Sequence, residues 1–211
     1  MPAKKARGED DPSTEEKIKQ AARQVFHQKG YAATRTRDIA EAAGINLALL
    51  NYYFRSKEKL FDLIMQETMR QFIQSMATVF NDPHSTLEQK LEIIADRYID
   101  LLTNEPGIPL FIMSEIRHNP DALLQTLNIK ELLLQSVFVH QFQTAVKEGK
   151  IPPQPFLQFM MNLMSLLVFP FIASPIFKNI GDLNDNAFNA LMHERKRMIP
   201  KWIKAVMKTK P

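Results

Sequence analysis

Helix start and stop signals recur along the whole chain, and no alternating run of β-branched residues interrupts them. The 211 residues contain only six glycines, and all six are isolated from one another. Ser13 with Glu16 and Ser85 with Glu88 have the spacing of capping boxes, and each pair precedes an apolar pattern of helical period. These features predict an all-α chain of about nine helices, among them 14–29, 57–80, 86–103, 121–148, 156–172 and 183–207.

Three short helices are predicted within residues 14–54, and only the turn around Gly44 separates the last two, 36–43 and 47–54. This is the spacing of a helix-turn-helix, in which a glycine supplies the left-handed backbone of the turn. We therefore expect a disordered tail over 1–12, a helix-turn-helix domain over 13–56 and a larger helical domain over 57–211.

The third short helix has two distinct faces. At 100° per residue, Leu50 and Phe54 lie 40° apart and form a buried stripe, while Ala48 and Tyr52 lie opposite it and Asn51 lies beside them. An exposed amide can bind adenine, a small side chain permits close approach to a thymine methyl group, and a phenol can bind a base or a phosphate. The exposed face therefore suits the major groove of DNA.

The charge of the chain is concentrated at its N-terminal end. Residues 1–60 carry twelve Lys and Arg against eight Asp and Glu, whereas residues 61–211 carry fifteen of each. A basic end on a neutral body indicates a polyanionic partner, although a chance asymmetry of surface charge would give the same count.

Residues 14–61 resemble the DNA-binding domain of the TetR family of bacterial transcriptional regulators. Three pieces carry the resemblance, in order: Phe-x-x-x-Gly-Tyr-x-x-Thr from Phe26, Arg-Asp-Ile-Ala-x-x-Ala-Gly from Arg37, and Tyr-Tyr-Phe-x-x-Lys-Glu-x-Leu from Tyr52. The resemblance implies a regulator that binds a palindromic operator in double-stranded DNA as a homodimer. The residues that fall on the family's DNA-contacting positions are Thr36, Arg37, Leu47, Ala48, Leu49, Asn51, Tyr52, Tyr53 and Lys57.

The same resemblance implies dimerisation through the last two long helices, for which we expect an interface of Phe156, Leu163, Leu167, Leu191, Met198 and Trp202. It also implies a small apolar or amphipathic effector that releases the operator when it binds the larger domain. A stripe of Met and Phe can line such a pocket but more often fills a core. The expected pocket residues are Tyr98, Phe111, Glu115, Phe138, His140, Phe142, Met160 and Met164.

Other function classes have little support in the sequence. No glycine-rich phosphate loop or HExxH motif occurs, so we expect neither an enzyme, nor a cofactor, nor a metal site. A helical protein-interaction adaptor without DNA binding is the alternative, but it leaves the basic end unexplained. The absence of cysteine and of an N-terminal apolar run favours a cytoplasmic protein with no membrane partner.

Overall fold

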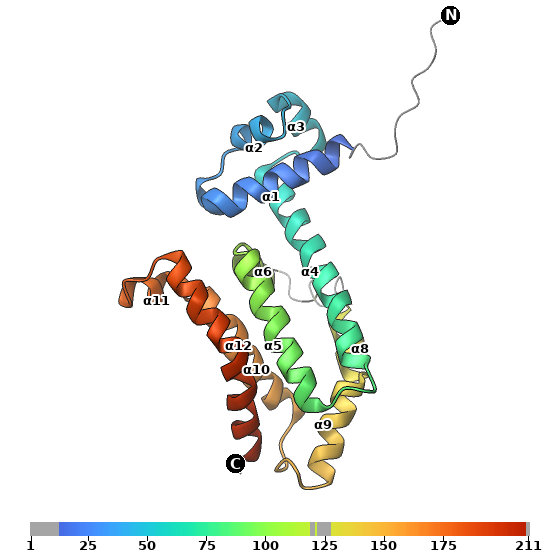
Figure 1. Cartoon of the computed structure of the whole chain (residues 1–211). Helices are drawn as coiled ribbons and strands as arrows, with labels where there is room; N and C mark the ends of the chain where they lie inside the picture. The colour runs from blue at the N-terminus through green and yellow to red at the C-terminus, as the bar shows by residue number, and fades with distance from the viewer. Residues whose placement is uncertain (1–12, 119–120, 122–127, 210–211) are drawn as a thin grey trace, which may run out of the picture. The chain divides into compact units, whose positions relative to one another are not determined.

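The computed structural model describes residues 13–118, 121 and 128–209 of the chain (Figure 1). Within these ranges the chain forms eleven helices and no strand, which confirms the predicted all-α class. The chain divides into two compact units, which we call unit 1 (Met1–Glu67) and unit 2 (Thr68–Pro211).

Unit 1 contains three helices and the beginning of a fourth: α1 (Thr14–Ala33), α2 (Thr36–Ala42), α3 (Leu47–Tyr53) and α4 (Lys57–Asn81). Ser13 begins α1 as predicted, because its Oγ accepts a hydrogen bond from the Glu16 N–H at 3.3 Å. Gly30 interrupts α1 with a φ of 74°, a conformation that a residue with a side chain adopts only at a cost. The regular part of α1 therefore ends before Gly30, where the predicted helix 14–29 ends.

The core of unit 1 includes the start of α4. Leu60 and Ile64 are fully buried, and the Phe61 ring meets the Phe26 ring of α1 edge to face at 5.2 Å between centroids. Lys19 of α1 also forms an ion pair of 2.9 Å with Glu67. Because these contacts attach the first turns of α4 to α1, unit 1 extends to residue 67, eleven residues beyond the boundary expected from the sequence.

Unit 2 contains the rest of α4 and seven further described helices. They are α5 (Leu87–Asn104), α6 (Ile108–His118), α8 (Ile129–Leu134), α9 (Val137–Lys147), α10 (Phe156–Ile172), α11 (Ser174–Ile180) and α12 (Asp185–Lys208). Helix α5 packs against α9, α10 and α12 and so lies at the centre of the unit. On the other side, α5 meets α4 through the rings of Tyr98 and Phe72, 4.7 Å apart.

Two predictions about helices in unit 2 were wrong. The single helix expected over 121–148 is divided, because Ser136 ends α8 and begins α9: its Oγ donates to the Leu133 carbonyl at 2.6 Å and accepts from the Val139 N–H at 3.3 Å. Helix α11 was not expected at all. Residues 122–127, in the first part of the helix expected over 121–148, lie outside the described residues.

The start of α5 also differs from the prediction by one residue. The sequence analysis predicted a capping box of Ser85 with Glu88, whereas the structure forms it from Thr86 with Gln89. The Thr86 Oγ1 accepts from the Gln89 N–H at 3.2 Å, and the Gln89 Oε1 accepts from the Thr86 N–H at 2.8 Å. Ser85 is left free to serve another partner, Lys90, which is considered below.

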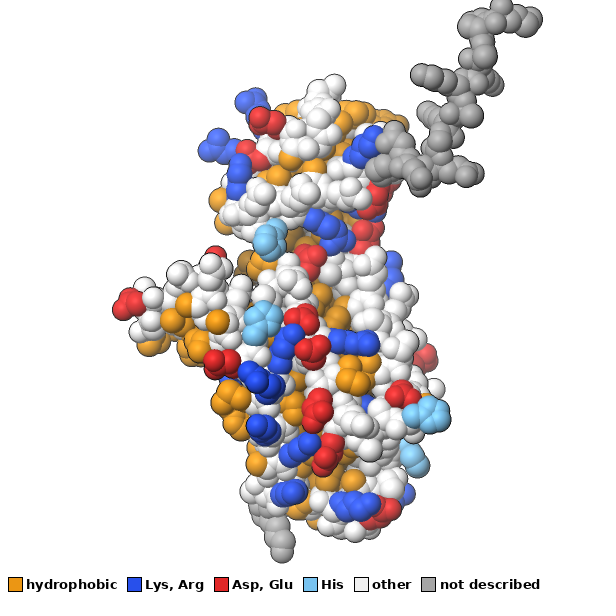
Figure 2. Space-filling view, viewed as in Figure 1, with side chains coloured by type: hydrophobic (Ala, Val, Ile, Leu, Met, Phe, Trp, Pro, Cys, Tyr) orange, Lys and Arg blue, Asp and Glu red, His pale blue; other side chains and the backbone are white. Residues whose placement is uncertain are grey.

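Four carboxylates of α5 face two lysines of α12. Lys196 lies 2.8 Å from Asp96 and 2.6 Å from Asp100, and Lys204 lies 3.1 Å from Glu88 and 3.5 Å from Glu92. Acidic and basic side chains accordingly alternate along one face of unit 2 (Figure 2). The i, i+4 carboxylates of α5 thus pair with α12 and hold the two helices in register.

We expect Lys196→Met to lower the stability of the chain by about 1 kcal/mol, because both carboxylates are more than one-third exposed and water screens the pairs. Burial by itself lowers the pKa of Lys196, but hydrogen bonds to Asp100 and Asp96 outweigh it and raise the pKa above its ordinary value of 10.5. The stabilisation is therefore complete below pH 10.5 and is lost as the pH rises through the raised pKa. Urea unfolding of both chains at pH 7 and above 10.5 tests this: a difference that does not shrink at high pH would contradict it.

No single helix among the described residues is long and apolar enough to cross a bilayer. Among the helices that the structure describes, α10 and α11 have that length and composition only when taken together, and the two are bent by 66° at the break between them.

Candidate nucleic-acid interface

The connection between α2 and α3 is a tight turn that the sequence encodes locally. Gly44 has a φ of 66°, in the left-handed region where glycine is favoured. Its N–H donates to the Glu41 carbonyl and the next N–H, of Ile45, donates to the Ala40 carbonyl, both at 3.0 Å. These bonds satisfy the last carbonyls of α2 and turn the chain into α3, as the helix-turn-helix spacing predicted.

Helix α3 is short and is stabilised at both ends. Asn46 begins it, with its Oδ1 accepting from the Leu49 N–H at 2.8 Å. Leu50 is fully buried and Phe54 is 7 % exposed, so these two side chains attach the helix to the core of unit 1. A helix of seven residues needs such tertiary support, because it is too short to be stable alone.

The opposite face of α3 is open to solvent. Ala48, Asn51 and Tyr52 are all exposed, and Tyr52 is 80 % exposed, which confirms the predicted orientation of this face. Tyr53 is 40 % exposed, and its ring meets the Tyr52 ring edge to face at 5.4 Å between centroids. Two adjacent exposed phenol rings beside an exposed amide offer a partner both aromatic surface and hydrogen-bonding groups.

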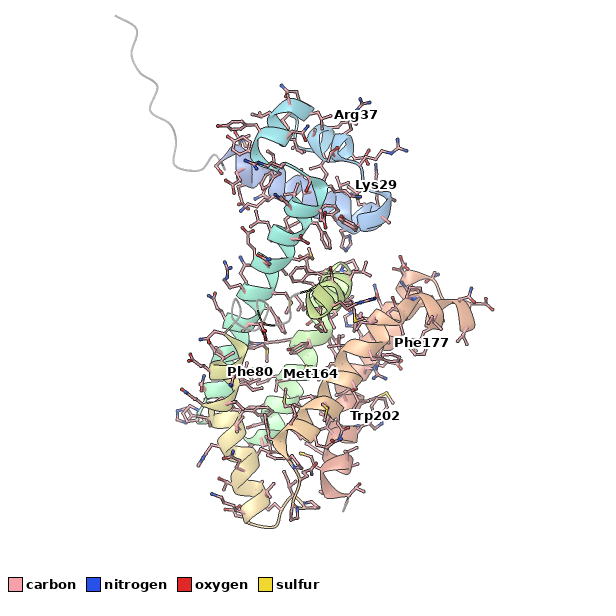
Figure 3. All side chains as sticks on the ribbon, turned by 180° about the vertical axis from the view of Figure 1, so that it is seen from behind. Lys29, Arg37, Phe80, Met164, Phe177 and Trp202 are labelled. Atoms are coloured by element: carbon pink, nitrogen blue, oxygen red, sulfur yellow. The ribbon has the colours of Figure 1, made fainter. Side chains whose placement is uncertain are left out.

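The other predicted contact residues lie at the edges of this face. Leu47 and Leu49 are half-buried, so their side chains contribute more to packing within unit 1 than to contact with a partner. In α2, Thr36 is half-buried and Arg37 is exposed at the outer edge of unit 1 (Figure 3). The start of α2 is fixed by Asp38, whose carboxylate accepts from the Arg35 N–H at 2.9 Å and lies 3.2 Å from Lys29, and these two interactions lower the pKa of Asp38.

Lys57 makes contacts within unit 1 that the sequence did not reveal. Its ammonium group donates to the Tyr31 carbonyl at 2.8 Å and to the Thr34 carbonyl at 2.9 Å, and lies 4.3 Å from the centre of the Tyr31 ring. An ammonium group has three N–H donors, so one more bond remains available for a phosphate. Lys57 thus connects the start of α4 to the segment between α1 and α2.

We expect Lys57→Met to weaken binding to every duplex sequence by a similar factor. A lysine–phosphate contact contributes about 0.9 to the slope of log K against log salt, so that slope should fall by about this amount for each bound protomer. Lys147→Met, at an exposed lysine of α9, is the matched control and should leave both quantities unchanged. A weaker affinity with an unchanged slope would mean that Lys57 only holds its segment in place and does not contact phosphate.

The predicted effector residues do not gather around one described cavity. Phe111, Phe138 and Phe142 are at most 1 % exposed and belong to the core, where Phe138 and Phe142 pack with other rings. Tyr98, Met160 and Met164 are half-buried, and burial raises the pKa of Tyr98 to about 12, so its phenol stays protonated. His140 instead lines an open surface cavity of about 580 Å³ between α5, α9 and α12. The side chain of Glu115 lies outside the described residues.

The predicted dimer residues fall into two groups. Leu163 and Leu167 are 1 % exposed and belong to the core of the protomer, and the half-buried Phe156 packs against the Phe142 ring at 5.3 Å. The exposed members of the predicted set are Leu191 (45 %), Met198 (41 %) and Trp202 (36 %) on α12. On α10 the exposed apolar side chains are ones that the sequence analysis did not name: Leu157, Met161, Phe169 and Ile172.

Comparison with known proteins agrees with this geometry. The sequence model of the family described as "Bacterial regulatory proteins, tetR family" matches residues 18–64. Over 205 residues the chain is 24 % identical to the Bacillus subtilis protein named "Probable HTH-type transcriptional regulator YttP", covering 93 % of this chain and 95 % of that one. It is 27 % identical over 134 residues to the Bacillus subtilis "Fatty acid metabolism regulator protein", covering 61 % and 69 % of the two chains.

Among solved structures, the fold is similar to that of the transcriptional regulator FadR from Bacillus subtilis, crystallised in complex with stearoyl-CoA. The TM-score is 0.57 at 20 % identity, and the match covers 87 % of this chain and 96 % of that one. The helix-turn-helix geometry, the exposed face of α3 and these matches agree: residues 18–64 match the tetR family of bacterial regulatory proteins, and the chain is a DNA-binding transcriptional regulator.

Proposed function

We propose that the protein is a homodimeric repressor that reads a palindromic DNA operator through α3 and releases it when a small amphipathic effector binds unit 2. The exposed Ala48, Asn51 and Tyr52, held outward by the buried Leu50 and Phe54, are the observation that carries the proposal. A seven-residue helix reads only a few base pairs, so a two-fold pair of such helices is needed for useful affinity. We also propose that three residues contact the DNA backbone beside α3: Arg37, Tyr53 and Lys57.

The proposed dimer uses one apolar surface, which we call the dimer face: Leu157, Met161 and Phe169 of α10 with Leu191, Met198, Trp202 and Val206 of α12. At 100° per residue, Leu157 and Met161 lie on one stripe of α10, opposite the buried Phe159 and Leu163. Arg195 ties the two helices together, because its guanidinium donates to the Leu166 carbonyl at 2.7 Å and lies 5.1 Å from the Trp202 ring. A monomer rarely leaves so large an apolar face in water.

The proposed effector is a fatty acyl derivative with an anionic head group. Two proteins similar to this chain support that class: one is named for fatty acid metabolism, and the other was crystallised with stearoyl-CoA. Unit 2 is also rich in Phe and Met, side chains that adapt to long apolar ligands. The effector would act by binding the DNA-free state more tightly than the DNA-bound state, and could shift the equilibrium only by that difference.

The adaptor hypothesis is not favoured, since the relatives are transcriptional regulators. An adaptor would also have no need of an exposed amide and phenol on a helix that follows a helix-turn-helix turn.

Selection of DNA duplexes from a random pool by the full chain tests the proposal directly. The enriched sequence should be palindromic, and its affinity should fall steeply as salt rises from 50 to 200 mM, as expected for several phosphate contacts. Stearoyl-CoA should then release the duplex while free coenzyme A does not. Enrichment of no sequence would overturn the DNA proposal, whereas a palindrome that stearoyl-CoA leaves bound would overturn only the effector class.

A further inference from the structure

Helix α11 has no buried residue, although its sequence is apolar. Ile176 is 61 % exposed, Phe177 41 % and Ile180 75 %. At 100° per residue these three side chains fall within 100° of one another and form a single apolar face. In Figure 1, α11 extends away from the packed helices of unit 2, and hydrophobic side chains gather on the projection that it forms in Figure 2.

The contacts that hold α11 within the protomer are few. The Phe177 ring lies 6.2 Å from the ring of Phe169, and Lys178 pairs with Asp185 at 2.8 Å and lies over the Phe188 ring at 5.0 Å. A helix of seven residues is marginal in water without tertiary packing. The described residues therefore leave the apolar face of α11 open to another molecule.

The size of the surface is large enough to matter. We call Phe169, Ile172, Ile176, Phe177 and Ile180 the α11 patch. At about 200 Å² for a fully exposed large side chain, their exposed fractions leave on the order of 500 Å² of apolar surface. The largest apolar patch on a typical monomer is about 300–600 Å², and it is often functional. The α11 patch alone is of that size, and the dimer face adds to it.

We propose that the α11 patch is a clasp that packs against a second copy of this chain and extends the homodimer interface beyond α10 and α12. This inference rests on the proposed dimer. Continuity supports it, because Phe169 belongs to both the dimer face and the α11 patch. In Figure 3, Phe177 and Trp202 lie along the same side of unit 2. A stable interface needs about 800 Å² from each partner, and the clasp supplies a large part of that area.

The charge around α11 favours a protein partner over a membrane surface. Residues 174–185 carry one cation, Lys178, and two anions, Asp182 and Asp185. Helices that lie on anionic membranes instead carry Lys and Arg on the polar face. Lys178 is moreover already paired with Asp185, so the segment presents no net positive charge to lipid head groups.

The test is the dimer dissociation constant of the full chain, measured by sedimentation equilibrium over a dilution series. Ile176→Ser with Ile180→Ser removes two exposed side chains and leaves the core of the protomer intact. A symmetric dimer contains two copies of each isoleucine, so the double variant removes four apolar side chains from the interface. The dissociation constant should therefore rise by at least roughly a hundredfold. The matched control is Leu134→Ser at an exposed leucine of α8, which should leave the constant unchanged.

A second variant separates this inference from the dimer proposal. Trp202→Ala lies on the dimer face and should also weaken the dimer if α10 and α12 form the interface. A dimer that Trp202→Ala weakens but the double isoleucine variant does not would overturn the clasp and leave the dimer proposal standing. A dimer that neither variant weakens would overturn both. Flotation of the wild-type chain, but not of the double variant, with phosphatidylglycerol vesicles would assign the patch to a membrane and overturn the clasp.

Discussion

Asn51→Ala is expected to lower the preference of the protein for its operator over random DNA by about 2–6 kcal/mol. A bidentate amide–adenine contact is worth about 1–3 kcal/mol of discrimination, and a symmetric dimer presents two copies of the residue. The side chain is exposed, and the buried Leu50 and Phe54 hold the helix in place. The substitution should therefore remove base recognition without disturbing the fold of unit 1.

Two further measurements show whether Asn51 reads bases. Affinity for random duplex and its salt dependence should both stay at the wild-type level, because an amide carries no charge to release counterions. Asn104→Ala is the matched control, at an exposed asparagine of α5 in unit 2, and should change neither affinity. If the Asn51 variant keeps full discrimination between operator and random DNA, then α3 does not read its target through this face.

The helices of unit 1 were predictable because local sequence determines their ends. Ser13 and Asn46 accept the hydrogen bonds expected of helix-capping residues, and Gly30 and Gly44 have the positive φ expected of turn glycines. The period of the apolar residues then fixed which face of α3 is buried. The sequence did not show that Lys57 also binds backbone carbonyls of unit 1, because those carbonyls lie 23 and 26 residues away along the chain.

Unit 2 was less predictable because few positions of α10 are polar. When most positions are Leu, Met or Phe, periodicity separates the core face from an external apolar face only weakly. Leu163 and Leu167 were therefore assigned to the dimer, whereas the structure buries them and exposes Leu157 and Met161. In α12, charged residues separate the faces, and the three residues expected at the dimer interface, Leu191, Met198 and Trp202, are exposed; their place in an interface stays a prediction.

Lys90 is a buried lysine that the sequence pattern does not identify. A lysine within a capping-box helix reads as a surface residue, yet this side chain is 0 % exposed. Its ammonium group donates to the carbonyls of Asp82 and Ser85 and to the Ser85 Oγ, the last at 2.6 Å. Gln141 of α9 donates to the same Ser85 carbonyl at 2.8 Å. Lys90 therefore holds the turn between α4 and α5 from inside, where α9 also contacts it.

Lys90→Met is accordingly expected to destabilise the full chain by about 2–3 kcal/mol. Methionine fills a similar volume, but it offers no donor to two carbonyls and a hydroxyl that lie in the interior. Thermal unfolding should shift down by roughly 5–10 °C for a unit of this size. Lys147→Met, at an exposed lysine of α9, is the matched control and should change the stability by less than about 0.5 kcal/mol.

The pH dependence of this loss should be opposite to that of Lys196. Burial lowers the pKa of Lys90 below 10.5, although the nearby charge of Asp82 raises it in part. Between the lowered pKa and 10.5, the unfolded chain binds more protons at this group than the folded chain does, so wild-type stability rises with pH in that window. The difference in the free energy of unfolding between wild type and Lys90→Met should therefore grow as the pH approaches 10.5. The corresponding difference for Lys196→Met should instead shrink above pH 10.5. If the difference between wild type and Lys90→Met instead shrinks between the lowered pKa and 10.5, then the buried ammonium group stabilises the turn by more than its burial costs.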